Sequence, residues 1–262
     1  MVKLIATDMD GTLLNDKGTI NENVFSLINK LKSNNIKFAA ASGRFYCQLS
    51  RNFEKVKEDM IFIAHNGAFV KYNKGGKTLY SDEISKELLD HAVKLNPNLG
   101  EELFLSGESE AYIVSPTEHM LNTFSYFHVP AVILKSFSEI KAPIYKITYH
   151  MKDGVNNEIL EFLKENLDHR LQFVQSGDNW IDIMKKSTSK GNAIKILQEK
   201  FKIEKENTMV FGDYYNDLSM FKMAHHSYAM GNAPEEVKGK ANFIAKTNNE
   251  DGVYNVLNEM LG

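Results

Sequence analysis

Short apolar runs alternate with amphipathic stretches over the first part of the chain. Residues 3–7, 37–41 and 60–64 are apolar runs short enough for buried strands, and the first of them ends at an acidic cluster. Apolar side chains recur at helical spacing over residues 20–31, and a second helix is expected over 45–53. This strand–helix–strand–helix–strand order is typical of a parallel sheet with crossover helices.

The last part of the chain returns to the same alternation. The pattern predicts helices over 190–200, near 218–223 and over 253–261, and strands over 208–211 and 228–230. We expect these elements to join those of the first part in one α/β domain, a Rossmann-like core built on a parallel sheet.

The middle of the chain follows a different pattern. Short runs at 69–72 and 78–80 flank a glycine-containing turn, which predicts a β-hairpin, and the stretch that follows is richer in aromatic residues. Its predicted elements are helices over 86–95, 117–127 and 156–167 and strands over 144–150, 171–175 and 180–184. We therefore expect a smaller α+β domain at residues 82–187, inserted into a core formed by residues 1–81 and 188–262.

Composition narrows the class of protein. Of 262 residues, 43% are hydrophobic and 25% are charged, which is an ordinary globular composition. The 31 basic and 34 acidic residues give a net charge of −3, so charge offers no reason to expect nucleic acid or an anionic membrane as a partner. No run approaches the roughly 18 consecutive apolar residues of a membrane helix.

The cysteine content and the first residues indicate a compartment. Cys47 is the single cysteine, so an internal disulfide is impossible, and this fits a reducing environment. The acidic residues Asp8 and Asp10 come too early for a secretory signal peptide. We therefore expect a cytoplasmic protein, and the sequence leaves its oligomeric state open.

Two acidic loops follow predicted strands. Asp8 and Asp10 come directly after the first strand, and Asp213 and Asp217 follow the strand at 208–211. Ligands bind at the carboxyl ends of strands in open parallel sheets, so we expect the two loops to meet there. Carboxylates this close repel one another unless they share a proton or a cation. Hard oxygen donors with room for water suit Mg²⁺. We prefer this hypothesis to the alternative that both loops are ordinary surface turns that coincide by chance.

A hydroxyl and a lysine complete the candidate site. Ser42 follows the strand at 37–41, where a hydroxyl and free backbone N–H groups can bind an anion, although Ser42 also suits a plain helix cap. Lys190 opens a predicted helix, where the helix dipole disfavours a cation unless an anion lies close. We therefore expect its removal to change stability little. Together these residues predict a phosphoryl-transfer site.

The four elements, in this order and spacing, resemble the motifs of the haloacid dehalogenase superfamily of phosphohydrolases. Asp8–Leu13 resembles the first motif (Asp-x-Asp-Gly-Thr-Leu), Ser42 the second, Lys190 the third, and Gly212-Asp213 with Asn216-Asp217 the fourth. Further matches, to the Cof-like subfamily, are Ala41–Arg44, Asn66–Ala68, Ser189–Gly191, Ala229–Ala233 and Asn249–Val253. The predicted insertion matches the family's large cap domain in position and size. Tyr214 and Tyr215 are bulkier than the residues often found at their place.

The resemblance implies roles for the acids. Asp8 would attack phosphorus and form an aspartyl-phosphate. Asp10 would protonate the leaving oxygen and then deprotonate the water that hydrolyses the intermediate. Mg²⁺ would be held by Asp8, the backbone carbonyl of Asp10 and Asp213.

The resemblance also implies how phosphate is held. The residues expected to bind phosphate oxygens are Ser42, Lys190 and Asn216, with the backbone N–H groups of Met9 and Gly43. Thr12 is expected to orient Asp10. Asp217 is expected to support Lys190 or the metal rather than to bind the substrate.

The implied function is a Mg²⁺-dependent phosphatase of small phosphorylated metabolites. The cap would select the substrate, and its aromatic and polar residues make sugar phosphates the leading class. Two alternatives stay open: a phosphomutase or phosphotransferase of the same superfamily, and a phospho-accepting signalling module. The signalling modules are much shorter, and only an enzyme releases many phosphates per chain.

Overall fold

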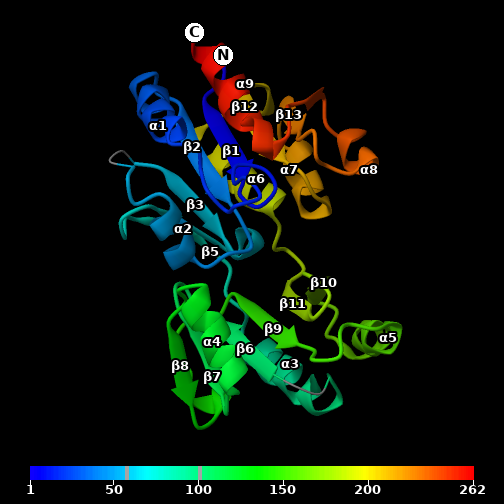
Figure 1. Cartoon of the computed structure of the whole chain (residues 1–262). Coiled ribbons are helices and arrows are strands. Elements are labelled where there is room, and N and C mark those ends of the chain that lie inside the picture. The colour runs from blue at the N-terminus through cyan, green and yellow to red at the C-terminus, as the bar shows by residue number, and fades with distance from the viewer. Residues whose placement is uncertain (57–58, 100–101) are drawn as a thin grey trace. The chain divides into compact units, whose positions relative to one another are not determined.

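The computed structural model describes residues 1–56, 59–99 and 102–262 (Figure 1). The chain divides into two compact units. The first unit comprises Met1–Arg44, Leu49–Ser81 and Ser189–Gly262, and the second comprises Phe45–Gln48 and Asp82–Thr188. The predicted insertion at 82–187 differs from the second unit by Thr188 and by the short segment Phe45–Gln48, which comes from much earlier in the chain.

The first unit is built on one sheet of eight strands in the order β14-β13-β12-β1-β2-β3-β4-β5. The strands are β1 (Leu4–Asp8), β2 (Lys37–Ala41), β3 (Ile61–Ala64), β4 (Phe69–Tyr72), β5 (Thr78–Ser81), β12 (Thr208–Gly212), β13 (His226–Ala229) and β14 (Phe243–Ile244). All neighbours from β14 to β3 pair in parallel, whereas β4 and β5 form the predicted antiparallel hairpin. The α/β core predicted from the two ends of the chain is confirmed.

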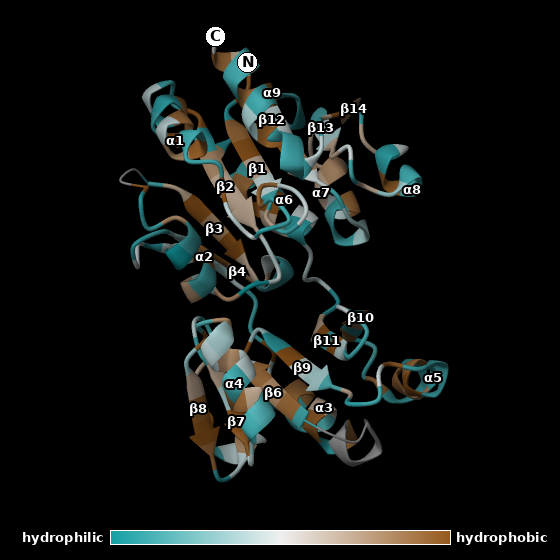
Figure 2. Cartoon of the chain, viewed as in Figure 1, coloured by the Kyte–Doolittle hydropathy of each residue, from teal (hydrophilic) through white to brown (hydrophobic). Residues whose placement is uncertain are grey.

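Burial on both faces explains the continuous apolar runs of the central strands. All residues of β1, β3 and β12 are buried, and they lie among the brown elements of Figure 2. Alternate residues face opposite sides: Leu4 and Ala6 of β1 pack in the cluster that contains α6. On the other side, Phe62 of β3 packs against Phe53, with ring centroids 5.7 Å apart.

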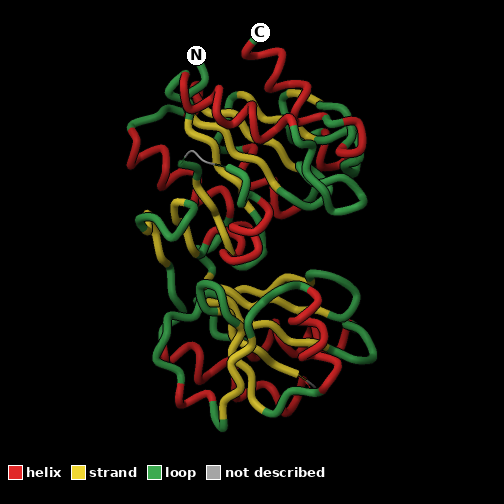
Figure 3. The backbone as a smooth tube through the Cα atoms, turned by 60° about the vertical axis from the view of Figure 1, so that its left-hand side comes forward, coloured by secondary structure: helices red, strands yellow, loops and turns green. Residues whose placement is uncertain are grey.

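Helices cover both faces of this sheet (Figure 3). They are α1 (Asn23–Ser33), α2 (Tyr46–Asn52), α6 (Lys190–Phe201), α7 (Leu218–Phe221), α8 (Glu235–Lys238) and α9 (Gly252–Leu261). α6, α7 and α8 share one apolar cluster with the strands, while α1 packs against β2 and α9. The loops that follow the carboxyl ends of the strands therefore lie along one edge of a doubly covered sheet.

The second unit is an α+β fold around a sheet of six strands in the order β10-β11-β9-β6-β7-β8. Its strands are β6 (Glu102–Ser106), β7 (Ala111–Val114), β8 (Ala131–Leu134), β9 (Lys146–His150), β10 (Leu171–Gln175) and β11 (Trp180–Lys185), and its helices are α3 (Lys86–Leu99), α4 (Glu118–Tyr126) and α5 (Asn157–Asn166). Every pair is antiparallel except β7 with β8. The sequence pattern missed β6, which has five residues, and β7 and β8, which have four each.

The two faces of this second sheet are covered differently. α3 and α5 contribute to one apolar cluster, and α4 contributes to another on the opposite face. Phe45 belongs to the cluster of α4, together with Phe104 and Phe124, and is 6% exposed. The backbone N–H of Tyr46 donates to Glu108 at 3.1 Å, which ties the same segment to the second unit. Among the helices in the described ranges, none is both long enough and apolar enough to cross a bilayer.

Candidate active site

Three carboxylates meet where the central strands of the first unit end. Asp8 is the last residue of β1, and Asp213 follows the last residue of the neighbouring β12. Asp217 comes from the short turn after it. Carboxylate oxygens of Asp8, Asp213 and Asp217 all lie within 4.8 Å of one another. The two acidic loops predicted to meet do so, because β1 and β12 are parallel neighbours.

Two glycines allow this close approach. Gly11 has φ +75°, and a Cβ there would collide with the carboxylate of Asp213. A Cβ at Gly212 would collide with the side chain of Asp217. Any larger residue at either position would push the acidic side chains apart.

Lys190 lies between the acids. It is the first residue of α6, directly after Ser189, whose hydroxyl caps the helix by accepting from the N–H of Asn192 at 3.0 Å. The Lys190 side chain is 1% exposed, and its ammonium donates to Asp8 and, at 2.7 Å, to Asp217. The anion that a cation at a helix start requires is therefore supplied within the protein by two carboxylates.

Both carboxylate oxygens of Asp217 accept hydrogen bonds, unlike those of the other two acids. One of its oxygens accepts from Lys190, and the other accepts from the backbone N–H groups of Asp213 and Tyr214 at 3.0 and 3.2 Å. Asp8 and Asp213 each have one oxygen that accepts no hydrogen bond from a described residue. The donor set left for a ligand is thus two hard carboxylate oxygens, which fits a divalent cation that keeps part of its water shell.

The structure corrects the expectation for Thr12. Its hydroxyl donates to Asp213 at 2.8 Å and not to Asp10. The cause is the tight turn at Gly11, in which the carbonyl of Met9 accepts from the backbone N–H groups of Thr12, Leu13 and Leu14. This turn carries Thr12 toward Asp213.

Asp10 has a different partner, Arg44. The guanidinium Nε donates to one oxygen of Asp10 at 2.9 Å, and a terminal nitrogen donates to the other. The Asp10 side chain is 60% exposed. Arg44 follows β2, and this contact could not be predicted, because the pattern of residues does not indicate which acid an arginine in a loop will contact.

The remaining predicted residues surround this centre. Ser42 is buried and its hydroxyl accepts from the N–H of Arg44 at 3.2 Å; this contact lies in the turn before α2, which begins only at Tyr46, so Ser42 is not the cap of that helix. Gly43 lies against the side chain of Asn66, to which Asn216 donates at 3.5 Å. The side chain of Met9 is buried in the core, so only its backbone can serve a ligand. Asn66 is a further residue that sequence reasoning did not place at the site.

Burial sets the charge state of the acids. Burial raises the pKa of Asp8 to about 8; Lys190 opposes this shift and Asp217 adds to it. Burial also raises the pKa of Asp213 to about 6, although the hydrogen bond from Thr12 lowers it. Burial alone would lower the pKa of Lys190, but Asp217 and Asp8 raise it above its ordinary value. The site therefore holds a charged Lys190 near two acids, Asp8 and Asp213, whose pKa values are raised.

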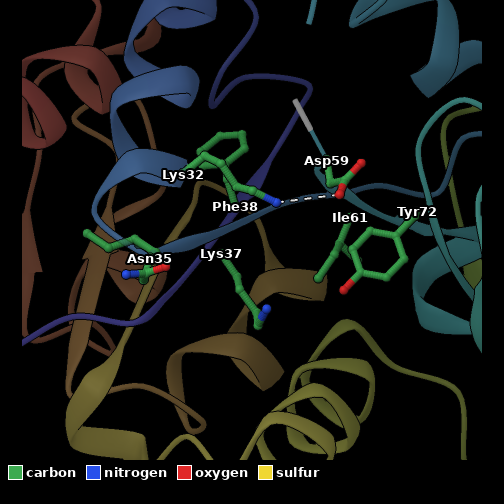
Figure 4. A pocket seen from close by; sticks show the side chains of 8 residues that line it. Lys32, Asn35, Lys37, Phe38, Asp59, Ile61 and Tyr72 are labelled. Carbon is green, nitrogen blue, oxygen red and sulfur yellow. Dashed lines mark hydrogen bonds and ion pairs between the residues drawn. The ribbon is translucent and has the colours of Figure 1, made fainter. Parts of the chain in front are cut away.

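A separate pocket opens at the other end of the strands (Figure 4). It has a volume of about 190 Å³ and lies where β2 and β3 begin, with Ile61 in its wall. Lys32 is paired with Asp59 at 3.4 Å, and the ammonium of Lys37 lies 4.1 Å from the ring centroid of Phe201. The acidic cluster lies at the opposite end of the strands, and none of its residues lines this pocket.

Known proteins share this fold and sequence. Over residues 5–257 the chain matches the family of haloacid dehalogenase-like hydrolases. The 5-amino-6-(5-phospho-D-ribitylamino)uracil phosphatase of Escherichia coli is 30% identical, in a match that covers 99% of this chain and 96% of that protein. A solved structure from Streptococcus mutans is 34% identical with a TM-score of 0.86, covering 100% of this chain and 99% of that one. A structure from Thermotoga maritima is 29% identical with a TM-score of 0.87, covering 99% and 97%.

These matches confirm the resemblance that the motifs carry. They span both units, and the similar curated proteins are phosphatases. Hydrolases of this family use a divalent metal, for which the acidic cluster supplies the donors. The chain therefore belongs to the haloacid dehalogenase-like hydrolases, in their Cof-like group, and is a phosphoric monoester hydrolase.

Proposed function

We propose that this protein is a Mg²⁺-dependent phosphatase of small phosphorylated metabolites, with sugar phosphates as the leading class and Asp8 as the nucleophile. The observation that carries the proposal is the buried contact of Asp8 with Lys190 beside Asp213. One carboxylate is held against a fixed cation, and a second offers its oxygen next to it. Such a centre binds phosphate oxygens and a divalent cation at the same time.

In the first step, a carboxylate oxygen of Asp8 attacks phosphorus, and the bond from phosphorus to the leaving oxygen breaks. Asp10 in its protonated form gives its proton to that leaving oxygen. A carboxylate held by both arms of a guanidinium has few lone pairs left for a proton. Asp10 must therefore exchange Arg44 for the substrate before this step.

In the second step, Asp10 takes a proton from water as the water oxygen attacks phosphorus, and the bond from phosphorus to Asp8 breaks. Inorganic phosphate leaves and Asp8 is regenerated. Lys190 remains charged throughout, held by Asp217, and compensates the negative charge on the phosphoryl oxygens. Asp8, the carbonyl of Asp10 and Asp213 would hold Mg²⁺, which would neutralise more of that charge.

The phosphate would be held by groups from four loops. Ser42 follows β2, Lys190 begins α6, and Asn216 follows β12. The backbone N–H groups of Met9 and Gly43 complete the set that the family pattern implies. Because the loops are fixed by different strands, their relative placement depends on the sheet rather than on any one loop.

The substrate class rests on the relatives and on the second unit. The Escherichia coli relative acts on a phosphorylated ribityl chain attached to a uracil ring. A polyhydroxylated chain that ends in a phosphate is also what a sugar phosphate presents. We infer that the second unit is a cap that selects the leaving group, and that a cytoplasmic location, expected from the lone Cys47, suits such metabolites.

The test is multiple-turnover release of inorganic phosphate from a panel of sugar phosphates and phosphorylated ribityl compounds. Release should require Mg²⁺, stop in EDTA, and be absent from a folded Asp8→Asn variant. Stoichiometric release of phosphate would separate a phosphatase from a phosphomutase, and many turnovers per chain would exclude a phospho-accepting module. Robust turnover by Asp8→Asn would remove Asp8 as the nucleophile.

A further inference from the structure

Two of the sequence motifs matched above have so far no role in the site. They are Ala229–Ala233, which begins at the last residue of β13, and Asn249–Val253, which leads into α9. Their loops lie at the same edge of the sheet as the catalytic loop, and asparagine side chains from them reach its backbone. We call Asn232, Asn248 and Asn249 the asparagine brace.

Asn232 holds one peptide of the catalytic loop. Its Nδ2 donates to the carbonyl of Gly11 at 2.8 Å. That carbonyl belongs to the same peptide plane as the N–H of Thr12, so the bond fixes the direction in which Thr12 leaves the turn. Thr12 in turn donates to Asp213. The contact from Asn232 thus lies one peptide away from a carboxylate of the acidic cluster.

Asn248 holds the end of the same loop. Its side chain is buried, and Nδ2 donates to the carbonyl of Leu14 and to the carboxylate of Asp16, both at 3.0 Å. Its backbone N–H donates to the Oδ1 of Asn232 at 3.0 Å, which orients that amide with its Nδ2 toward Gly11.

Asn249 completes the brace from the outside. Its Nδ2 donates to Asp16 at 2.8 Å, and its Oδ1 accepts from the backbone N–H of Asp16 at 3.1 Å. The hydrogen bonds from Asn249 and Asn248 lower the pKa of Asp16, so its carboxylate stays ionised and remains an acceptor for both amides. The segment from Gly11 to Asp16 is therefore bonded at three points to chain more than 200 residues away.

We propose that Asn232 and Asn248 are positioning residues of the phosphatase site, which hold the turn after Asp10 so that Thr12 reaches Asp213 and Asp10 reaches the leaving oxygen. This inference rests on the proposed function. The strands alone fix where the turn begins, at Asp8, but nothing in the sheet fixes its far side. A misplacement of about 1 Å in a reacting group can cost about 10²-fold in rate.

The decisive variants exchange an amide for a carboxylate of the same shape. In Asn248→Asp the two donors become an acceptor that faces a carbonyl and the Asp16 carboxylate. In Asn232→Asp the Gly11 carbonyl faces a second acceptor and loses its donor. Asn232→Ala would be a weaker test, because water could fill the space and donate to that carbonyl instead. We expect kcat to fall by about 10²-fold in Asn248→Asp and by at least about tenfold in Asn232→Asp.

Two further readouts separate positioning from simple structural support. KM should stay within about twofold, because Ser42 and Lys190 come from loops that the brace does not touch. The Mg²⁺ concentration that gives half of the maximal thermal stabilisation should rise in both variants, since Asp213 loses its alignment by Thr12. This second measurement needs no turnover.

Asn242→Asp is the matched control. Asn242 donates its Nδ2 to the carbonyl of His225 at 2.7 Å, the same kind of bond in the same unit, but to a loop that carries no acid of the cluster. It should keep kcat and the Mg²⁺ midpoint of the wild type even if its melting temperature falls. If Asn248→Asp does not fold, Asn232→Asp, whose side chain is exposed, carries the test.

The outcomes distinguish this inference from the proposed function. Wild-type kcat and Mg²⁺ midpoint in Asn232→Asp and Asn248→Asp, with Asp8→Asn inactive, would overturn the positioning role and leave the phosphatase intact. Equal losses in Asn242→Asp would make the brace an ordinary stabilising network. No Mg²⁺-dependent phosphate release by the wild type would refute the proposed function itself.

Discussion

At the scale of single residues, Lys190 shows how burial changes an argument made from the helix dipole. A lysine at the start of a helix is disfavoured by a few tenths to about 1 kcal/mol, so its loss was expected to matter little for stability. The structure places its ammonium between Asp8 and Asp217, with 1% of the side chain exposed. Lys190 therefore stabilises the buried carboxylates by more than its unfavourable interaction with the helix dipole costs.

We predict that Lys190→Ala abolishes activity and, above the pKa of about 8 of Asp8, lowers the free energy of unfolding by about 3–5 kcal/mol, because it leaves two buried carboxylates without their cation. Urea unfolding followed by circular dichroism measures this. Lys195→Ala on the same helix is the control, since its exposed pair with Glu199 contributes at most about 0.5 kcal/mol. A stability of Lys190→Ala equal to that of the control would contradict the prediction.

The raised pKa values make metal binding dependent on pH. Burial raises the pKa of Asp8 to about 8 and that of Asp213 to about 6 from a model-peptide value of 3.8. A cation binds the ionised forms, so its affinity should increase from pH 6 to pH 8 and binding at pH 6 should release protons. Titration calorimetry of Mg²⁺ in two buffers of different protonation enthalpy measures both. Equal affinity at the two pH values would show that the acids are already ionised.

The same shifts predict the stability of the protein without metal. Between pH 3.8 and about 8 the folded state holds a proton on Asp8 that the unfolded chain has lost. The folded state therefore binds more protons, and the free energy of unfolding falls as the pH rises through this window. Added Mg²⁺ should reverse that trend at the alkaline end. A free energy of unfolding that rises from pH 5 to pH 8 in EDTA would contradict the assignment.

Much of the site follows from the sequence, and the failures have one cause. Asp8, Asp213 and Lys190 could be placed together because each stands at the end of a predicted strand or the start of a predicted helix. Thr12 and Arg44 could not be placed correctly, since their directions depend on the turn at Gly11 and on contacts between loops. Periodicity fixes where an element ends but not where the side chains beyond it point.

At the scale of elements, the two sheets differ in how well their strands could be predicted. β1, β2 and β3 are buried on both faces and are read easily as apolar runs. β8 is an edge strand whose first three residues are exposed, and β6 and β7 are short strands between turns. β8 therefore lacks the apolar pattern that burial imposes, whereas β6 is largely buried and was missed although residues 103–105 are an apolar run.

The exposed edge at β8 carries a prediction of its own. Ile133 is 59% exposed and Val132 is 38% exposed, on a strand that pairs only with β7 among the described strands. Ile133→Lys should reduce aggregation at high concentration and leave kcat unchanged, because a charge on an edge strand blocks further pairing. Light scattering on heating measures this. The control, Ile113→Lys in the buried face of β7, should instead unfold the second unit.

At the scale of the whole molecule, the segment Phe45–Gln48 changes what an exchange of the second unit requires. Two chimeras with a relative's second unit test this: one replaces 82–188 alone, and the other also replaces 45–48. The first should melt lower, because Phe45 would meet a foreign apolar cluster that was shaped around another residue. Equal melting temperatures would show that the segment is a passive neighbour. Any altered ranking of substrates with unchanged Mg²⁺ dependence would support selection by this unit.

The pairing of β1 with β12 also sets an order of events during synthesis. Leu4 lies beside Thr208, so the strand that bears the nucleophile acquires this neighbour only after the whole second unit has left the ribosome. At a translation rate of roughly 5–20 residues per second, the edge of β1 that pairs with β12 stays unpaired for on the order of 10–40 s. All residues of the inserted unit are synthesised before β12, so this unit can complete its fold first. The acidic centre is thus assembled among the last parts of the newborn protein, when β12 closes the gap.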